Sequence, residues 1–207
     1  MKARAKSTTS QSKRIQTTRR NALPSDQNQA RDQFLLSMFP TPLGWVGLLG
    51  QDGQLISISV GQPSSKSIQS AVSKAARIVH LEDWNPGLRN LFEAYFEGEV
   101  VDFSQVEIRL PPMTSFRQQI IAATRRLAYG ETASYGELAR RVGHPRAARA
   151  VGTAMSCNRF PILIPCHRVL AAGGKIGGYS SSRGIAFKQR LLEMESRAIG
   201  DARKFHR

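Results

Sequence analysis

The sequence has little of what disulfide scaffolds and membrane proteins require. It contains only two cysteines, Cys157 and Cys166, in 207 residues. That is too few for a disulfide framework and is typical of a reducing compartment. No apolar run approaches the roughly 20 residues of a membrane-spanning helix, so we expect no membrane partner. Acidic residues are also few: 15 stand against 30 Lys and Arg, giving a net charge of +15. This excess favours a polyanion such as nucleic acid, although charge alone does not decide it.

The first 32 residues lack acidic side chains before Asp26 and contain few apolar ones. Such a segment cannot bury a core, and we expect residues 1–32 to form a basic disordered tail. No apolar stretch follows the Lys and Arg residues, so a secretory signal is not predicted. Two interpretations of the tail stay open, an organelle transit peptide and an arm that touches DNA.

Residues 33–110 are predicted to form an N-terminal α/β module, a small antiparallel sheet plus helices. Its strand-like stretches are 34–36, 45–49 and 55–60. Short turns join these stretches, and the turn at 51–53 is a hairpin signal. Apolar residues at helical spacing then run from Ile68 through Ala75 and Ala76 to Val79, and a second helix is expected over 85–97. We find no catalytic constellation in this module.

Residues 111–207 are predicted to form a mostly α C-terminal domain. The double proline at 111–112 ends regular structure and marks the boundary. Ser115 is a candidate cap for a helix running to Gly130. The helices expected beyond it are 136–142, 146–156 and a last one near the C-terminus. A short Gly-containing turn separates the first two, which is the outline of a helix-turn-helix.

The second helix of this pair, 146–156, is rich in small residues and has arginines near its start. Small side chains let a helix approach a surface closely, and Asn or Gln side chains that read base edges are missing. The pattern suits sequence-independent contact, with an arginine inserted into a base stack from the minor groove. The alternative, which this helix alone favours, is that the alanines pack a core.

The sharpest signal is an apolar stretch, 161–165, that delivers Cys166 next to His167. A thiolate is a nucleophile, and a histidine can deprotonate it. Neighbours on an extended chain point to opposite sides, so a bridging water or a local turn would have to connect the two. Glu193 and Glu195 are candidates for orienting the imidazole. A buried inert cysteine and a Cys157–Cys166 disulfide stay open, and a metal site is disfavoured by the missing ligand spacing.

The run 164–169, Ile-Pro-Cys-His-Arg-Val, resembles the active-site signature of the O6-alkylguanine-DNA alkyltransferases, also called methylated-DNA–protein-cysteine methyltransferases. Further matching positions are Ser134, Tyr135, 147–152, Asn158, Pro161, 177–180 and Lys188. Between Tyr135 and Ser180 the order and spacing are similar to the family's without a gap. The resemblance covers about residues 35–197 and is weaker in the N-terminal module.

This resemblance implies a single-turnover DNA-repair enzyme. Cys166 would accept the alkyl group, His167 would act on it as a general base through a water, and Glu195 would lie behind His167. Asn158 would organise the turn before the cysteine. Tyr135 would promote flipping of the damaged nucleotide and donate to guanine N3. The thioether product has no electrophilic carbonyl for water to attack, so turnover would stop after one event.

The resemblance also implies how substrate is held. Arg149 would fill the space left by the extruded base, the Ser180 backbone N–H would face the O6 atom, and Lys188 would support the pocket near Tyr135. The Cys166 and Val169 carbonyls would accept from the exocyclic amine. The other positions expected at the minor groove or the substrate are Ala147, Ala148, Ala150, Gly152 and Tyr179.

The expected partner is double-stranded DNA carrying O6-alkylguanine, with O4-alkylthymine as a second substrate, bound through the minor groove by a monomer. No cofactor or metal is expected, since the zinc-binding cysteines of some relatives are absent. The location would be the cytoplasm with the nucleoid in a prokaryote, or the nucleus or an organelle in a eukaryote. The loop 181–187 is about two residues longer than the family pattern, which leaves adduct size open.

Two rival functions remain at this point. One is a lesion-binding protein of the alkyltransferase-like class, whose members replace the cysteine, usually by tryptophan; Cys166 argues against it. The other is an unrelated cysteine hydrolase, for which nothing in the sequence indicates a peptide or amide substrate.

Overall fold

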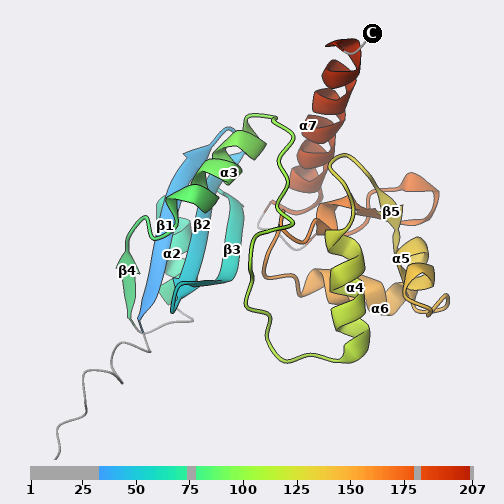
Figure 1. Ribbon diagram of the computed structural model, residues 1–207, viewed down its shortest axis with the longest axis horizontal. Helices are drawn as coiled ribbons and strands as arrows, with labels where there is room; N and C mark the ends of the chain where they lie inside the picture. The colour runs from blue at the N-terminus through green and yellow to red at the C-terminus, as the bar shows by residue number, and fades with distance from the viewer. Residues whose placement is uncertain (1–32, 74–77, 180–182, 206–207) are drawn as a thin grey trace, which may run out of the picture.

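A four-stranded sheet forms the N-terminal half of the molecule (Figure 1). The computed structural model describes residues 33–73, 78–179 and 183–205, so the expected tail 1–32 lies outside it. The strands are β1 (Phe34–Thr41), β2 (Gly44–Gln51), β3 (Gln54–Gln62) and β4 (Val79–Leu81), in the spatial order β3-β2-β1-β4. The first three pair antiparallel, as predicted.

The edge strand β4 departs from the prediction because it runs parallel to β1. Helix α2 (Ser65–Ser73) supplies the crossover that a parallel neighbour requires. Val79, expected at the end of this helix, instead begins β4 and pairs with Phe34, so the prediction was wrong there. Ala75 and Ala76 lie outside the described residues.

The sheet is covered on both faces by helices. On one face Ile68 and Val72 of α2 pack against Leu36 and Leu49. On the other, helix α3 (Pro86–Phe96) packs against side chains such as Leu48. The start of α3 follows the prediction, since the Asn85 side chain accepts a hydrogen bond from the Leu88 N–H at 3.0 Å. The alternation of the strand side chains thus feeds two separate apolar clusters.

The C-terminal half is mostly helical and contains the predicted helix-turn-helix. Its elements are α4 (Ser115–Arg125), β5 (Ala133–Ser134), α5 (Tyr135–Arg141), α6 (Ala148–Ser156), β6 (Val169–Leu170) and α7 (Gly184–Phe205). Helices α5 and α6 form the helix-turn-helix, and β5 pairs parallel with β6. The predicted fold class, an α/β module followed by a mostly α domain, is therefore confirmed.

The limits of α4 differ from the prediction at both ends. Its cap is Thr114, whose side chain accepts from the Arg117 N–H at 3.3 Å, and Ser115 is the first helical residue. The helix ends at Arg125 rather than at Gly130. The chain beyond it turns early because Leu127 is buried and its N–H donates to the Thr124 carbonyl.

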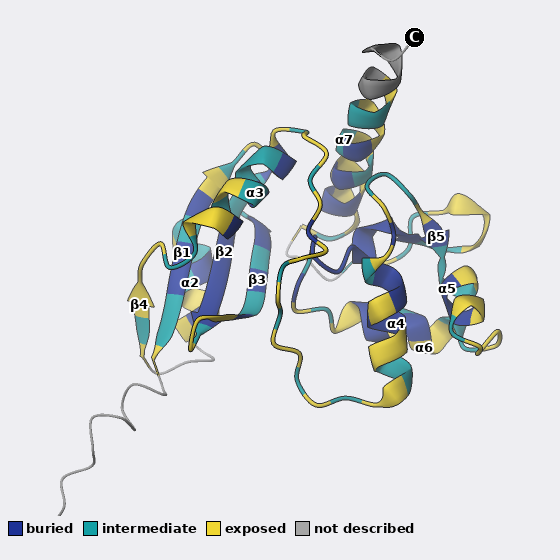
Figure 2. Cartoon of the chain, in the orientation of Figure 1, coloured by how far each residue is buried: buried dark blue, intermediate teal, exposed yellow. Residues whose placement is uncertain are grey.

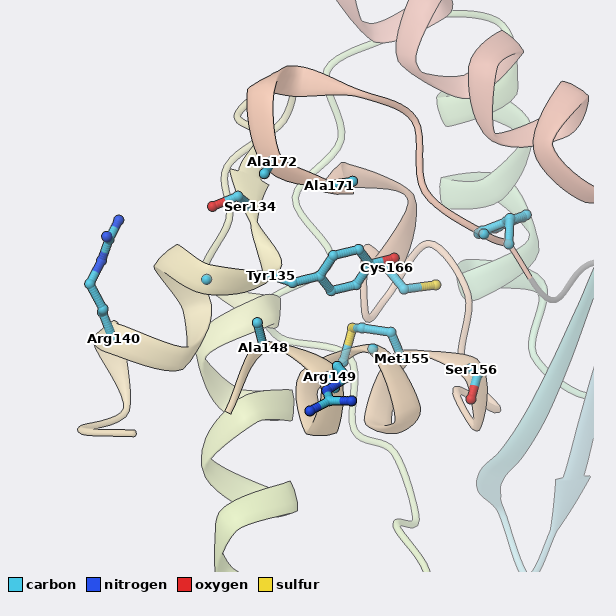
Figure 3. Close-up of a pocket in the computed structure, with 14 residues that line it drawn as sticks. Ser134, Tyr135, Arg140, Ala148, Arg149, Met155, Ser156, Cys166, Ala171 and Ala172 are labelled. Atoms are coloured by element: carbon cyan, nitrogen blue, oxygen red, sulfur yellow. The ribbon is translucent and has the colours of Figure 1, made fainter. Parts of the chain in front are cut away.

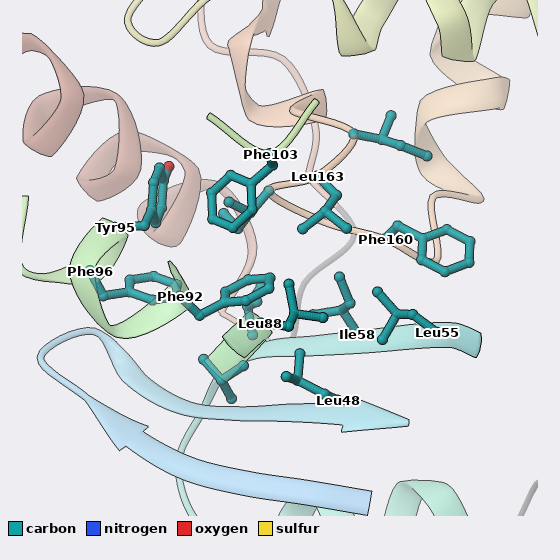
Figure 4. Packing of buried hydrophobic residues seen from close by; sticks show 14 of the residues in the cluster. Leu48, Leu55, Ile58, Leu88, Phe92, Tyr95, Phe96, Phe103, Phe160 and Leu163 are labelled. Atoms are coloured by element: carbon teal, nitrogen blue, oxygen red, sulfur yellow. The ribbon is translucent and has the colours of Figure 1, made fainter. Parts of the chain in front are cut away.

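The largest apolar cluster is shared between the two halves (Figure 4). Leu48, Leu55 and Ile58 of the sheet face Phe160 and Leu163 from the segment that precedes the cysteine. Buried residues lie in both halves, on β2 of the sheet and on α4 and α7 (Figure 2). The predicted boundary near residue 111 stays a prediction, because the core continues across it. No helix in the described ranges combines the length and hydropathy of a membrane span.

Candidate active site

Asn158 organises the loop between α6 and Cys166. Its Oδ1 accepts from the Phe160 N–H at 2.9 Å, and its Nδ2 donates to the Ile164 carbonyl at 2.8 Å. The same Nδ2 lies 3.0 Å from Cys166 Sγ. The chain returns on itself at Ile162, whose φ of 76° lies in the left-handed region that β-branched residues rarely adopt. Asn158 therefore has the position that the sequence analysis predicted for it.

Cys166, His167 and Arg168 form one 3₁₀ turn rather than an extended segment. Of the two alternatives in the sequence analysis, a bridging water or a local turn, the turn is present, and it directs adjacent side chains to different neighbours. Cys166 is 6% exposed and lies at the wall of a cavity, whereas His167 is fully buried. Cys157 is exposed and also free, so the Cys157–Cys166 disulfide is not formed.

The sulfur of Cys166 has a pKa above the usual value for a thiol. Burial raises it, while the hydrogen bond from Asn158 and the charge of Lys188 act in the opposite direction without cancelling it. Lys188 is itself fully buried, and its Nζ donates to the Val169 carbonyl. The resting protein therefore holds a thiol, and attack by this sulfur requires a base.

The candidate for that base is His167, which is hydrogen-bonded to a buried carboxylate. His167 Nε2 lies 2.8 Å from Glu195 Oε1. Glu195 is 1% exposed and also accepts from Arg168 Nε and Nη2, both at 2.9 Å, and from the Gly130 N–H at 3.0 Å. Glu193, the other candidate, bonds instead to Gln189 at 3.0 Å on the exposed side of α7. The structure therefore selects Glu195.

Burial is the main reason that His167 holds a neutral ring. Burial acts to raise the pKa of Glu195, but the hydrogen bonds from His167 and Arg168 and the charge of Arg168 outweigh it and hold that pKa well below its usual range. Burial lowers the pKa of His167, and Glu195 only partly offsets this. With Nε2–H donating to the carboxylate, Nδ1 is the basic nitrogen. It is buried without a hydrogen-bond partner in the described ranges, as expected of a nitrogen that must take up a proton.

A cavity of about 870 Å³ opens in front of Cys166 (Figure 3). The ring of Tyr135, at the start of α5, points toward the cysteine from across this cavity. Burial, and to a smaller extent the charge of Cys166, raises the pKa of Tyr135 above its usual value, so its hydroxyl stays a donor. The volume lies within the range of small-molecule sites, which is about 300–1,000 Å³.

Most predicted substrate contacts meet at this cavity, but not all of them. Those in its wall are Tyr135, Ala148, Arg149, Gly152, Cys166 and Tyr179. Ala147 is half-buried and packs against the core, while Ala150 is exposed outside the cavity. The core-packing alternative thus holds for Ala154 and Val151 on the other face of α6. Ser180 lies outside the described residues.

Two residues of this arrangement were missed by the sequence analysis. Arg168 belongs to the signature itself, and its Nη1 also donates to the Leu127 carbonyl at 2.8 Å. Tyr95 reaches the site from α3, with its hydroxyl 2.6 Å from Glu195 Oε1. The available signal was a tyrosine on the apolar face of a helix, since a buried hydroxyl needs a partner. The described residues contain no cluster of three or more metal-ligating side chains.

Comparisons of sequence and of fold show which known proteins this chain is similar to. A sequence profile described as "6-O-methylguanine DNA methyltransferase, DNA binding domain" matches residues 115–197. A methylated-DNA–protein-cysteine methyltransferase of Methanosarcina acetivorans is 34% identical over 160 residues, which cover 77% of this chain and 96% of that protein. One from Mycobacterium tuberculosis is 45% identical over 129 residues, covering 59% of this chain and 76% of that protein.

Solved structures agree with these sequence matches. The O6-methylguanine methyltransferase of M. tuberculosis superposes with a TM-score of 0.66 at 34% identity, covering 80% of this chain and 94% of that chain. M. tuberculosis OGT in complex with DNA superposes with a TM-score of 0.65 at 35% identity, covering 79% of this chain and 94% of that one. The likeness therefore includes both halves of the molecule.

Proposed function

Because the chain belongs to the methylated-DNA–protein-cysteine methyltransferase family, we propose that it repairs O6-alkylguanine in DNA by moving the alkyl group onto Cys166. The observation that carries this proposal is the cysteine at the wall of a cavity large enough to admit a base, with a hydrogen-bonded histidine–glutamate pair next to it in the fold. The reaction is a methyl transfer from DNA to a protein cysteine, and the protein is consumed by it.

The chemistry follows from the protonation states around the sulfur. His167 Nδ1 takes the Cys166 proton through a water molecule, and the resulting imidazolium is stabilised by the ionised Glu195. The thiolate attacks the alkyl carbon, a sulfur–carbon bond forms, and the carbon–oxygen bond to guanine breaks. A proton donated by Tyr135 to the base offsets the negative charge that develops on the leaving guanine.

Reaching the lesion requires the nucleotide to leave the duplex, because the alkyl carbon lies on a base edge inside the stack. Helix α6 presents the exposed Arg149 and the small residues Ala148 and Gly152 along the cavity. This surface fits a minor groove, with Arg149 occupying the space of the extruded base. We propose that a monomer binds in this way, and that the protein resides with DNA, at the nucleoid in a prokaryote or in the nucleus or an organelle in a eukaryote.

A mass measurement tests the transfer. The protein is incubated with duplex DNA carrying O6-methylguanine and then weighed intact. The unmodified sequence and Cys157→Ser should each gain one methyl, and Cys166→Ser should gain none while still binding the DNA. Tight lesion binding without added mass would instead support the sensor class. Repeated turnover with water would support a hydrolase.

A second comparison tests the role of Arg149. Arg149→Ala should slow repair in duplex DNA by more than it slows attack on a free O6-alkylguanine base, because only the duplex has to be opened. Equal losses on both substrates would remove Arg149 from the extrusion step.

A further inference from the structure

Tyr95 is a fully buried side chain of the N-terminal half that touches the reactive pair of the C-terminal half. Its hydroxyl donates to Glu195 Oε1 at 2.6 Å and lies 3.3 Å from His167 Nε2. Its ring is fixed by edge contacts with Phe103 and Tyr129, each with ring centroids 5.8 Å apart (Figure 4 shows Tyr95 and Phe103). The Tyr95 hydroxyl is therefore held in a fixed position next to both Glu195 and His167.

We propose that Tyr95 is a positioning residue for alkyl transfer, which holds Glu195 Oε1 so that His167 keeps its proton on Nε2 and presents a neutral Nδ1 toward the reaction. The inference rests on the proposed function. Glu195 Oε1 accepts hydrogen bonds from three groups, the Tyr95 hydroxyl, His167 Nε2 and Arg168 Nη2. The Tyr95 hydrogen bond withdraws negative charge from the oxygen that faces the imidazole, and without it the imidazolium would be better stabilised before the thiol has lost its proton.

The other charged groups that face His167 also shift its pKa. They are Glu195 and Lys188 on α7 and Arg168 within the turn. Burial lowers the pKa of His167 most, Glu195 raises it, and Arg168 and Lys188 lower it. Tyr95 itself stays protonated, because burial and the charge of Glu195 raise its pKa well above the usual value. It is therefore a constant donor, and the N-terminal half supplies part of the reactive centre.

Two matched variants isolate the hydroxyl. Tyr95→Phe removes the one that donates to Glu195 and keeps the packed ring. Tyr129→Phe makes the same change on the neighbouring ring, whose hydroxyl is buried but has no hydrogen-bond partner among the described residues. Any effect of losing a buried hydroxyl in general should appear in both variants.

The first measurement is the rate of methyl transfer from lesion duplex against pH. Tyr95→Phe should be slower by about tenfold near neutral pH, the loss expected for one hydrogen bond to a charged group. The acid limb of its rate profile should move to higher pH, because His167 then holds its extra proton more tightly. DNA affinity should not change, and Tyr129→Phe should match the parent protein in rate and in pH profile.

The second measurement reads His167 without DNA, by ¹⁵N NMR of the imidazole across pH, below the unfolding temperature of each variant. The parent and Tyr129→Phe should show the Nε2–H tautomer, and Tyr95→Phe should become protonated at higher pH. A parent protein that transfers no methyl would refute the proposed function, while the His167 titration would still decide whether Tyr95 controls the protonation of His167. Unchanged His167 titration in Tyr95→Phe would overturn the positioning role, whether the rate is unaffected or falls equally at every pH.

Discussion

Glu195 is the residue on which the reactive centre depends most. Its carboxylate, only 1% exposed, accepts hydrogen bonds from Arg168, His167, Tyr95 and the Gly130 backbone N–H. A buried charge is tolerated only when it is paired and hydrogen-bonded. Neutralising it leaves the Arg168 guanidinium without its counter-charge. Glu195 therefore matters for the stability of the fold as well as for the proposed reaction.

Glu195→Gln should therefore destabilise the protein strongly. Breaking one partner of a buried ion pair typically costs about 3–5 kcal/mol, because the other charge stays buried and uncompensated. Denaturant unfolding monitored by circular dichroism measures the change. Glu193→Gln is the matched control on the exposed side of α7 and should shift the free energy of unfolding by no more than about 0.5 kcal/mol. Equal changes in the free energy of unfolding for both variants would show that the buried Glu195 carboxylate stabilises the fold no more than the exposed Glu193.

Acid should destabilise the protein in two steps. The pKa of His167 is lowered in the fold, so its contribution is complete above the unfolded value of about 6.5 and is lost as the pH falls below it. The pKa of Glu195 is also lowered, so its contribution is lost below about 4.3, the unfolded value. Melting temperatures between pH 8 and pH 2 measure both steps. A melting temperature that rises on acidification would contradict the buried neutral histidine.

At the residue scale, sequence reasoning selected Cys166 and its neighbours but not all of the residues that hydrogen-bond to them. Cys166, His167 and Asn158 lie close together in the chain, so a short motif and a resemblance are enough to select them. Tyr95 lies 100 residues from Glu195 in the sequence, and only the fold brings its hydroxyl to the carboxylate. The choice between Glu193 and Glu195 likewise depends on which face of α7 meets the core.

At the scale of the elements, long apolar patterns predicted the secondary structure well and short segments did not. The three long strands and α3 follow alternation and helical spacing that the sequence displays. Strand β4 has three residues, too few for a pattern, and it exists because Phe34, Leu35 and Leu36 of β1 offer it a partner. The predicted cap of α4 was wrong for a related reason. Thr114 and Ser115 have similar capping propensities, and only the backbone geometry decides which of them is the cap.

Thr114→Ala and Ser115→Ala test that correction. Thr114 has extended backbone geometry and accepts from the Arg117 N–H, so its loss should cost about 1 kcal/mol of stability. Ser115 is already helical, where alanine is the better helix former, so its replacement should be neutral or slightly stabilising. Thermal unfolding of the two variants side by side gives the result. The opposite order would restore Ser115 as the cap.

At the scale of the whole molecule, the two halves are held together by more than the shared apolar cluster. Gly61 at the end of β3 has a φ of +65° and lies directly under the Phe187 ring of α7, where a Cβ would come within 2.6 Å. Arg183 Nη1 donates to the Leu43 carbonyl at 3.3 Å. Phe187 in turn packs against Tyr179 in the cavity wall, with ring centroids 6.2 Å apart. The sheet thus helps to shape the reactive cavity.

Gly61→Ala should separate packing from backbone conformation when it is compared with Gly53→Ala. Both glycines have positive φ, but a Cβ at Gly53 meets nothing within 4 Å. Gly53→Ala should cost about 1 kcal/mol for the left-handed backbone alone. Gly61→Ala should cost more by about 1–3 kcal/mol, because Phe187 must move. Equal unfolding free energies for the two variants would show that the contact with Phe187 carries no energy.

The 3₁₀ turn of Cys166, His167 and Arg168 also sets what the gene can tolerate. Cys166 faces the cavity, His167 bonds to the Glu195 carboxylate, and Arg168 bonds to the same carboxylate and to the Leu127 carbonyl. Inserting or deleting one residue in this turn would place each following side chain in the position of its neighbour, where it meets the wrong partner. Natural variation in this stretch should therefore consist of replacements, with insertions and deletions confined to loops elsewhere.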